Sequence, residues 1–252
     1  MILRVVENSL MIGESGTGLR RNIDLMEAFT RAFQNSNLMR YLPTAIIPAI
    51  GETLVMVTIS FVLSVIFGVM FGIILVMTDK SGLSPHPAFH AILERITDIT
   101  RSFPMMILIV AIAPVTRFFI GTRIGVKAAI FAITLGSTPF AVRLTENALN
   151  TVDPQLIRMA QSIGATKLQI VFKVMLVEAL PTLISNFTIM AINILNTSAM
   201  AGAVGAGGLG AVALTYGYQR FDYLIMYFIV IILILLVLVI QTIGSRLYEY
   251  TK

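Results

Sequence analysis

The sequence predicts an all-α integral membrane protein with five transmembrane helices, and three observations support this fold class. The chain of 252 residues is 57% hydrophobic and only 12% charged, about half the charged share of a soluble domain. Its apolar residues gather in long runs, each close to the roughly 20 residues that cross a bilayer. The last run, 223–243, contains no charged residue at all. A soluble core could not bury so much apolar surface.

The first 40 residues form a polar N-terminal extension ahead of the transmembrane domain. Met26, Phe29 and Phe33 recur there at helical spacing. This pattern fits an amphipathic helix lying on the membrane surface, and it fits a packing helix equally well.

The transmembrane domain comprises residues 41–252. Pro43 and Pro48 are expected to break the apolar lead-in to the first span, while Pro104 and Pro114 fall inside the second. Backbone groups freed by a proline are tolerated in a membrane only against protein or water. The spans are predicted over 51–77, 102–120, 125–142, 181–200 and 223–243.

The positions of the charged residues and histidines help to exclude some classes of function. The 18 Lys and Arg residues divide evenly between the two sides of a five-span topology, so charge alone does not orient the chain. No ionisable residue lies at the centre of a span, and no internal repeat is visible, which argues against a secondary transporter. Arg143 and Glu146 are spaced to form an ion pair. His86 and His90 are interpreted as polar loop residues, and no metal site is predicted.

The stretch AGAVGAGGLG, residues 201–210, contains a G-x-G-x-x-G pattern. Dinucleotide binding requires a strand before this pattern and an acidic residue about 20 positions after it. Long apolar runs flank the stretch instead, and Asp222 follows too early. The sequence also lacks a phosphate-binding P-loop, so the chain itself is not predicted to be an enzyme or to bind a cofactor.

The loop 149–180 between the third and fourth spans carries clear helix signals. Asp153 is a helix N-cap, Pro154 fits the first helical position and Gly164 ends the helix. Thr166 and Gln169 form a capping box for a second helix. The first helix carries an apolar stripe: Leu156, Ile157, Met159, Ala160 and Ile163. Such a helix can pack on the bundle or dock a partner, and the pattern leaves both open.

This loop resembles the coupling segment of ABC importer permeases, E-A-A-x-x-x-G followed by I-x-L-P. Ala160 and Gly164 match, whereas Arg158 stands where Glu is usual, Met159 replaces the first Ala and Val177 replaces the Pro. Four further stretches look like the methionine-import (MetI-like) permeases, and the resemblance covers residues 51–243. They are RSFPMMILIVAIAPVTRFFIGTRIG, TPFAVRLTENAL, SAMAGAVGAGGLG and YGYQRF.

The resemblance implies an ABC type I importer permease fold in a bacterial inner membrane, with the N-terminus outside and the C-terminus cytoplasmic. It implies a homodimer around a central path and two cytoplasmic ATPases, which bind ATP and Mg²⁺ and dock on the helix 153–164. It also implies an extracytoplasmic binding (lipo)protein that delivers an amino acid. Methionine is the expected substrate, and another small organic solute is the alternative. Membrane lipid is an expected partner and nucleic acid is not.

The resemblance also gives the glycine stretch a role. It lies at the outer end of the fourth span, where irregular backbone must face protein or water. We expect it to form an outer gate or a dimer interface, with a plain flexible loop as the alternative. The residues concerned are Met200, Gly202, Gly205, Gly207, Gly208 and Gly210. No substrate-binding residue is predicted.

Overall fold

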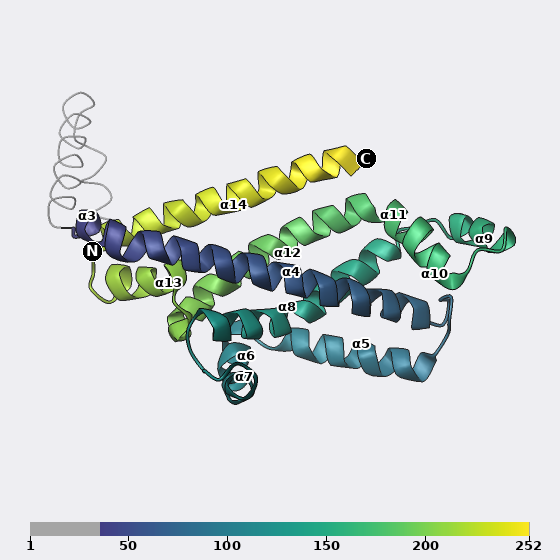
Figure 1. Cartoon of the computed structure of the whole chain (residues 1–252), viewed down its shortest axis with the longest axis horizontal. Helices are drawn as coiled ribbons and strands as arrows, with labels where there is room; N and C mark the ends of the chain where they lie inside the picture. The colour runs from purple at the N-terminus through teal and green to yellow at the C-terminus, as the bar shows by residue number, and fades with distance from the viewer. Residues whose placement is uncertain (1–35, 252) are drawn as a thin grey trace, which may run out of the picture.

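The computed structural model describes residues 36–251, and in this range the chain forms helices and no strands (Figure 1). Segments labelled η are π-helical. The elements in chain order are α3 (Leu38–Tyr41), η1 (Leu42–Ile46), α4 (Ile47–Thr78), α5 (Pro87–Ser102), α6 (Met105–Ala111), α7 (Ala113–Ile120), α8 (Val126–Leu149), α9 (Pro154–Ser162), α10 (Lys167–Ile170), η2 (Val171–Met175), α11 (Leu176–Glu178), α12 (Leu180–Ala201), η3 (Gly202–Ala206), α13 (Gly208–Val212), η4 (Ala213–Tyr218) and α14 (Tyr223–Thr251).

Four helical runs in the described range are long and apolar enough to cross a membrane: Leu38–Thr78, Val126–Leu149, Leu180–Ala206 and Tyr223–Thr251. The predicted fourth span agrees with α12 to within one residue at each end. The helices that contain the predicted third and fifth spans extend beyond them, since α8 continues past Pro139 to Leu149 and α14 continues to Thr251.

The first span begins earlier than predicted. Helical structure starts at Leu38, inside the predicted extension, and continues through Pro43 and Pro48 to Thr78. Both prolines lie inside this continuous run, and the π-helical turn η1, which contains Pro43 and directly precedes α4, takes up the irregular hydrogen bonding without ending the helix. The expectation that these prolines break the lead-in was therefore wrong. Met26, Phe29 and Phe33 lie outside the described residues.

The prediction of a single helix over the second span, 102–120, was also wrong. The chain leaves helical geometry at Phe103 and again at Ile112, so α6 and α7 are separate helices of seven and eight residues. Pro104 precedes the first residue of α6, and Pro114 lies in the first turn of α7. Both prolines thus start new helices.

Helices α4 and α8 pack side by side in parallel. The hydroxyl of Ser60 donates to the carbonyl of Ile130, and that of Ser64 donates to the carbonyl of Thr134, each over 3.4 Å. Gly68, further along the same face of α4, lies directly on Ala141. Small residues at every fourth position let the two backbones approach closely, as is common between membrane helices.

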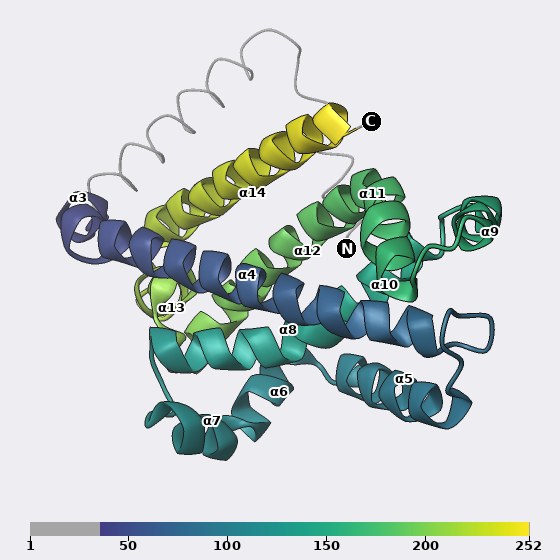
Figure 2. The ribbon, with the colours of Figure 1, turned by 45° about the vertical axis from the view of Figure 1, so that its right-hand side comes forward.

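The parallel arrangement requires a return path between the end of α4 and the start of α8. Helices α5, α6 and α7 together provide it, as Figure 2 shows. Helix α12 packs against α8, α4 and α14. The main core lies among these helices and includes Met56, Ile133, Met190, Ile194 and Leu195.

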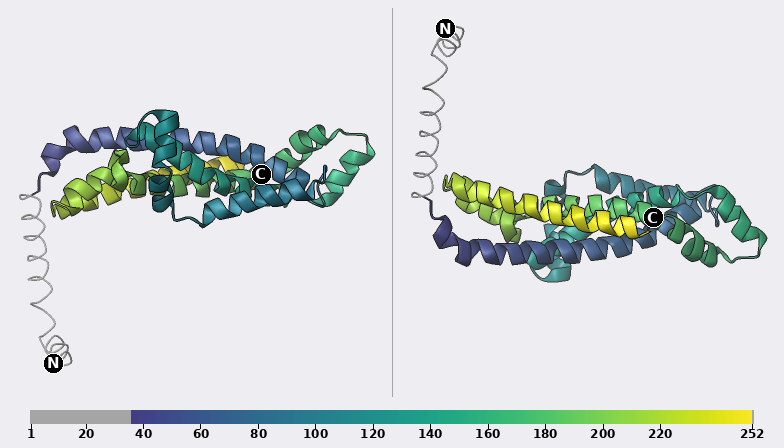
Figure 3. Two further views of the ribbon diagram at one scale, coloured as in Figure 1. Left: turned by 90° about the horizontal axis from the view of Figure 1, so that it is seen from below. Right: turned by 90° about the horizontal axis from the view of Figure 1, so that it is seen from above.

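The molecule is elongated, with different features at its two ends (Figures 1 and 3). Helices α9 and α10 lie at one end, which we call the coupling end. Helices α3 and α13 and the start of α14 lie at the opposite end. The described chain therefore begins at one end and finishes α14 nearer the other.

Candidate coupling and gating sites

The coupling-end helix α9 has the termini that its sequence predicts. The Asp153 carboxylate accepts a hydrogen bond from the Gln155 amide at 2.8 Å, and Pro154 occupies the first turn. Gly164 follows the helix with φ of 81°, a left-handed conformation that favours glycine. Both hydrogen bonds of the predicted capping box between Thr166 and Gln169 are present. Local chemistry alone therefore shapes this turn.

The predicted apolar stripe of α9 divides between two surfaces. Ala160 is buried and Ile157 packs beside it, in a cluster with Leu149, Val152 and Met175. Leu156 is half-buried.

The other part of the stripe points outward. Met159 is 60% exposed and Ile163 is 82% exposed. Leu168 and Phe172, from the next helical segment, are also exposed. These last two residues were not among the predicted coupling residues, although their i, i+4 spacing is visible in the sequence. We call Met159, Ile163, Leu168 and Phe172 the coupling patch.

A cavity of about 390 Å³ lies between α9 and the loop that joins α4 to α5. Asp79, Gly82, Arg158 and Gln161 are among the residues that line it. A hydrogen bond from the Ser81 hydroxyl lowers the pKa of Asp79, which therefore stays ionised. The side chain of Arg158, the residue that departs from the usual coupling motif, thus borders the same cavity as a carboxylate.

At the opposite end, the glycine stretch forms a sharp turn between η3 and α13. Gly205, Gly207 and Gly208 have φ of 92°, 88° and 73°. Gly202 is helical, with φ of −55°, and Gly210 lies within α13. These last two glycines allow close packing instead. A Cβ on Gly202 would lie 2.5 Å from a backbone nitrogen, and one on Gly210 would overlap the Ala199 carbonyl.

Hydrogen bonds anchor this turn to two other parts of the bundle. The amide of Gly208 donates to the Glu52 carboxylate at 2.6 Å, and the amide of Leu209 donates to the Thr53 hydroxyl at 2.9 Å. The amide of Gly125, before α8, donates to the carbonyl of Gly205 at 2.9 Å. The pairing of Glu52 with the glycine turn was not predicted from the sequence. Such anchoring argues against a plain flexible loop.

Comparison with known proteins identifies the family. Residues 65–251 match the family described as binding-protein-dependent transport system inner membrane component. The chain belongs to this family. It is therefore a membrane permease of a transport system and not itself an enzyme, as the sequence predicted.

Relatives of this permease agree with the predicted subfamily. The probable D-methionine transport system permease protein MetI of Vibrio cholerae serotype O1 is 46% identical over 202 residues, which cover 80% of this chain and 90% of that protein. The methionine import system permease protein MetP of Bacillus subtilis is 38% identical over 172 residues, covering 68% of this chain and 78% of that one.

Solved structures confirm the fold. A chain in an inward-facing structure of the MetNI methionine ABC transporter superposes on this permease with a TM-score of 0.81 and 37% identity. The match covers 85% of this chain and 98% of that chain. An amino acid ABC transporter solved with histidines, at 18% identity and a TM-score of 0.65, shares the fold.

Near the coupling end of the permease, an ionic cluster joins α5 to α8. The Arg143 guanidinium lies 2.6 Å from Glu146, 2.8 Å from Asp98 and 3.3 Å from Glu94. The predicted pairing with Glu146 is confirmed, but the partners on α5 were missed because that helix was not predicted. His90, interpreted as a loop residue, lies in α5, and its Nδ1 is 3.0 Å from the Leu75 carbonyl. His86 precedes the helix, as expected.

Replacing Arg143 by leucine should destabilise the permease. Its side chain is 16% exposed, and its loss would remove the one guanidinium that Glu94, Asp98 and Glu146 share. Hydrogen bonds between charged groups contribute about 1.5–3 kcal/mol. We expect Arg143→Leu to lower the Tm in detergent by several degrees. Arg101→Leu is the control, because Arg101 is 41% exposed and lies 3.9 Å from Asp98. Equal Tm values for both variants would contradict a stabilising role for the cluster.

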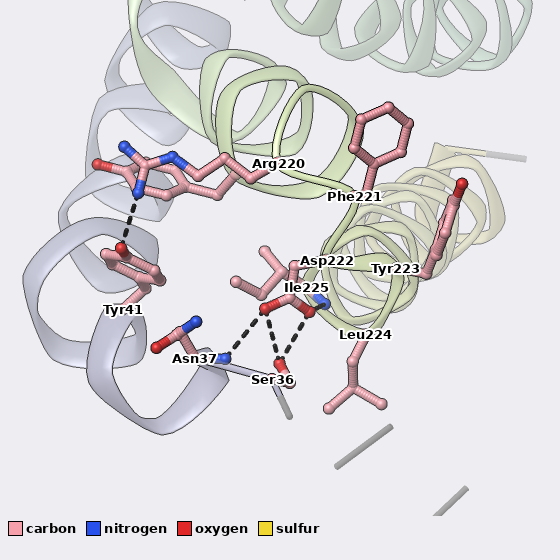
Figure 4. Close-up of a pocket in the computed structure, with 10 residues that line it drawn as sticks. Ser36, Asn37, Tyr41, Arg220, Phe221, Asp222, Tyr223, Leu224 and Ile225 are labelled. Atoms are coloured by element: carbon pink, nitrogen blue, oxygen red, sulfur yellow. Dashed lines mark hydrogen bonds between the residues drawn. The ribbon is translucent and has the colours of Figure 1, made fainter. Parts of the chain in front are cut away.

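A cavity of about 330 Å³ lies at the end of the molecule opposite the coupling end (Figure 4). Asp222 caps α14 and accepts hydrogen bonds from the Ser36 hydroxyl and the Asn37 amide. Arg220 donates to the Tyr41 hydroxyl at 2.8 Å and stacks on Tyr216 at 4.7 Å. The motif YGYQRF thus contacts α3, and Asp222 directly after it ties the residues before α3 to the start of α14. These contacts give Asp222 a structural role.

Proposed function

We propose that the chain is the permease subunit of an ATP-driven importer for methionine. The observation that carries this proposal is the match to the MetNI methionine ABC transporter, which extends over 98% of the matched chain. The methionine transport functions of the Vibrio and Bacillus relatives point to the same substrate.

Two copies of the chain would form the path, with two separate ATPases at the coupling end. The coupling patch supports this proposal, because exposed aromatic and aliphatic side chains are typical of protein interfaces. ATP and Mg²⁺ would bind to the ATPases. Among residues 36–251, no group of acidic, histidine or cysteine side chains could hold a metal ion.

The coupling end would face the cytoplasm of a bacterial inner membrane, and the glycine turn would face outward. The N-terminus would then lie outside and the C-terminus inside. Helices α5–α7 would supply the second of five crossings, in place of one unbroken span. An extracytoplasmic binding protein would deliver substrate to the outer end, and lipid would surround the outer apolar faces.

The glycine turn and Met200 would form the outer gate, close to the second copy. Met200 is 50% exposed at the end of α12. The turn beside it is held by hydrogen bonds to Glu52, Thr53 and Gly125. Movement of α4 or α8 would therefore be transmitted directly to the turn.

Uptake into proteoliposomes tests the proposed function. The permease is co-expressed with its partner ATPase and reconstituted, and uptake of labelled methionine is measured with the binding protein present. We expect uptake that requires ATP and stops when the ATPase carries a phosphate-binding lysine variant. ATP-dependent uptake of another solute without methionine uptake would reassign the substrate. Methionine uptake that is independent of ATP would contradict the importer class.

A further inference from the structure

One exposed row runs along α12. Between Pro181 and Ala201, exposed side chains occur only at positions 185, 189, 193, 196 and 200. Their spacing of four, four, three and four places them on a single helical face. We call this set the α12 row, and it consists of Ser185, Ile189, Asn193, Asn196 and Met200.

Two amides lie in the middle of this row. At 1.5 Å per residue, Asn193 lies about 20 Å along the helix from its start at Leu180, and Asn196 about 4.5 Å further. Neither side-chain amide has a hydrogen-bond partner within residues 36–251, whereas the nearby Asn186 amide donates to the Leu144 carbonyl at 3.0 Å. In lipid, an unpaired amide at this depth would be costly.

Another spanning helix of the bundle has an exposed face of a different kind. The exposed residues of α14 from 227 to 239 are all aliphatic except for one tyrosine. They are Tyr227, Val230, Ile231, Ile234, Leu235, Leu238 and Val239. Such a surface suits lipid, and the α12 row does not. The row must therefore face either water or another protein surface.

We propose that the α12 row lines the translocation path, and that Asn193 and Asn196 contact the passing substrate. This inference rests on the proposed function. The substrate class that fits is a zwitterionic amino acid with an apolar side chain. A carboxamide offers two N–H donors to a carboxylate and one oxygen acceptor to an ammonium group. Ile189 and Met200 flank the amides and offer apolar contact to the substrate side chain.

The absence of charge in the row also suits a path. A buried ion pair would hold a zwitterion strongly, whereas transport requires binding weak enough for release. Neutral amides replace part of the hydrogen bonding to water that the substrate loses, and they place no fixed charge in the path. The row leads directly to Met200 and the glycine turn, so the substrate would reach the amides after passing the outer gate.

Thiol accessibility tests the inference directly, because the chain contains no cysteine. Single cysteines are introduced at Asn193 and Asn196, and at Leu235 of α14 as a control. The complete transporter in vesicles open to both sides is treated with a small, water-soluble methanethiosulfonate reagent. We expect rapid labelling at 193 and 196, slowed by methionine, and little labelling at 235. Modification at 193 or 196 should also block uptake.

Amide variants provide the second measurement. Asn196→Ala should raise the methionine concentration for half-maximal uptake about tenfold, as the loss of a hydrogen bond to a charged group predicts. Asn196→Gln should restore much of the affinity, and Leu235→Ala should change little. Recovery of the dimer and ATPase on purification shows that each variant assembles.

The outcomes separate this inference from the proposed function. If the unmodified transporter takes up methionine but cysteines at 193 and 196 stay unlabelled and Asn196→Ala transports normally, the row is a structural contact between copies and the inference is wrong. If the cysteines are labelled but methionine is not transported and does not slow labelling, the row faces water and the substrate proposal fails instead.

Discussion

Replacing Gly210 by alanine is expected to abolish uptake, although it adds a single methyl group. A Cβ at this position would overlap the backbone carbonyl of Ala199 in α12. Backbone atoms cannot move aside as a side chain can, so α12 and α13 would have to separate. Overpacking of this kind costs about 1–3 kcal/mol or more. We expect more than a tenfold loss of ATP-dependent methionine uptake in proteoliposomes, together with a lower Tm.

Gly51→Ala is the matched control for this prediction. Gly51 lies in α4, and a Cβ there would meet no atom within 4 Å. Alanine should be neutral or stabilising by about 0.5–1 kcal/mol, because glycine is the poorer helix former. Gly208→Leu should resemble Gly210→Ala, since its Cβ would lie 2.7 Å from Met56 and Thr53 at a φ of 73°. Normal uptake by both turn variants would show that close packing here is dispensable.

Ile163→Asp is expected to release the ATPase from the permease. Ile163 is 82% exposed at the end of α9 and belongs to the coupling patch. A carboxylate buried there against an apolar partner surface would have to lose its water without compensation. Loss of an interface hot-spot residue costs about 2 kcal/mol or more, which corresponds to about a 30-fold weaker complex. The measurement is the amount of ATPase that co-purifies with tagged permease.

Ser162→Asp provides the control for charge alone. Ser162 is the neighbouring residue and is already polar and exposed. This variant should retain the ATPase, whereas Phe172→Asp should lose it as Ile163→Asp does. Both patch variants should still elute from a sizing column as the intact dimer. Normal ATPase recovery with Ile163→Asp would place the ATPase interface elsewhere.

The sequence predicted best those features that depend on neighbouring residues. The start of α9 at Asp153 and Pro154, its end before Gly164 and the capping box after it are all present. Each depends on hydrogen bonds or φ angles within a few residues, so no distant contact was needed to specify it. The apolar runs likewise identified the class of protein, because any such run must avoid water.

Helix continuity was less predictable where prolines occur. A proline inside a continuous helix and a proline that ends one look alike in sequence. Pro43 and Pro48 lie within one long helical run that contains a π-helical turn, while Pro104 starts a new helix after a break. The difference lies in what surrounds the freed backbone groups, and that environment comes from other helices.

The sequence by itself determined the fold class, the family motifs and the local form of the coupling turn. Only the tertiary structure decided which residues these features meet. It divided the glycines between left-handed positions and close-packed ones, paired Glu52 with the amide of Gly208, and gathered Glu94 and Asp98 around Arg143. It also separated the amides of the α12 row from the aliphatic surface of α14. Such contacts join residues far apart in the chain, and helix periodicity shows which residues share a face but not what that face meets.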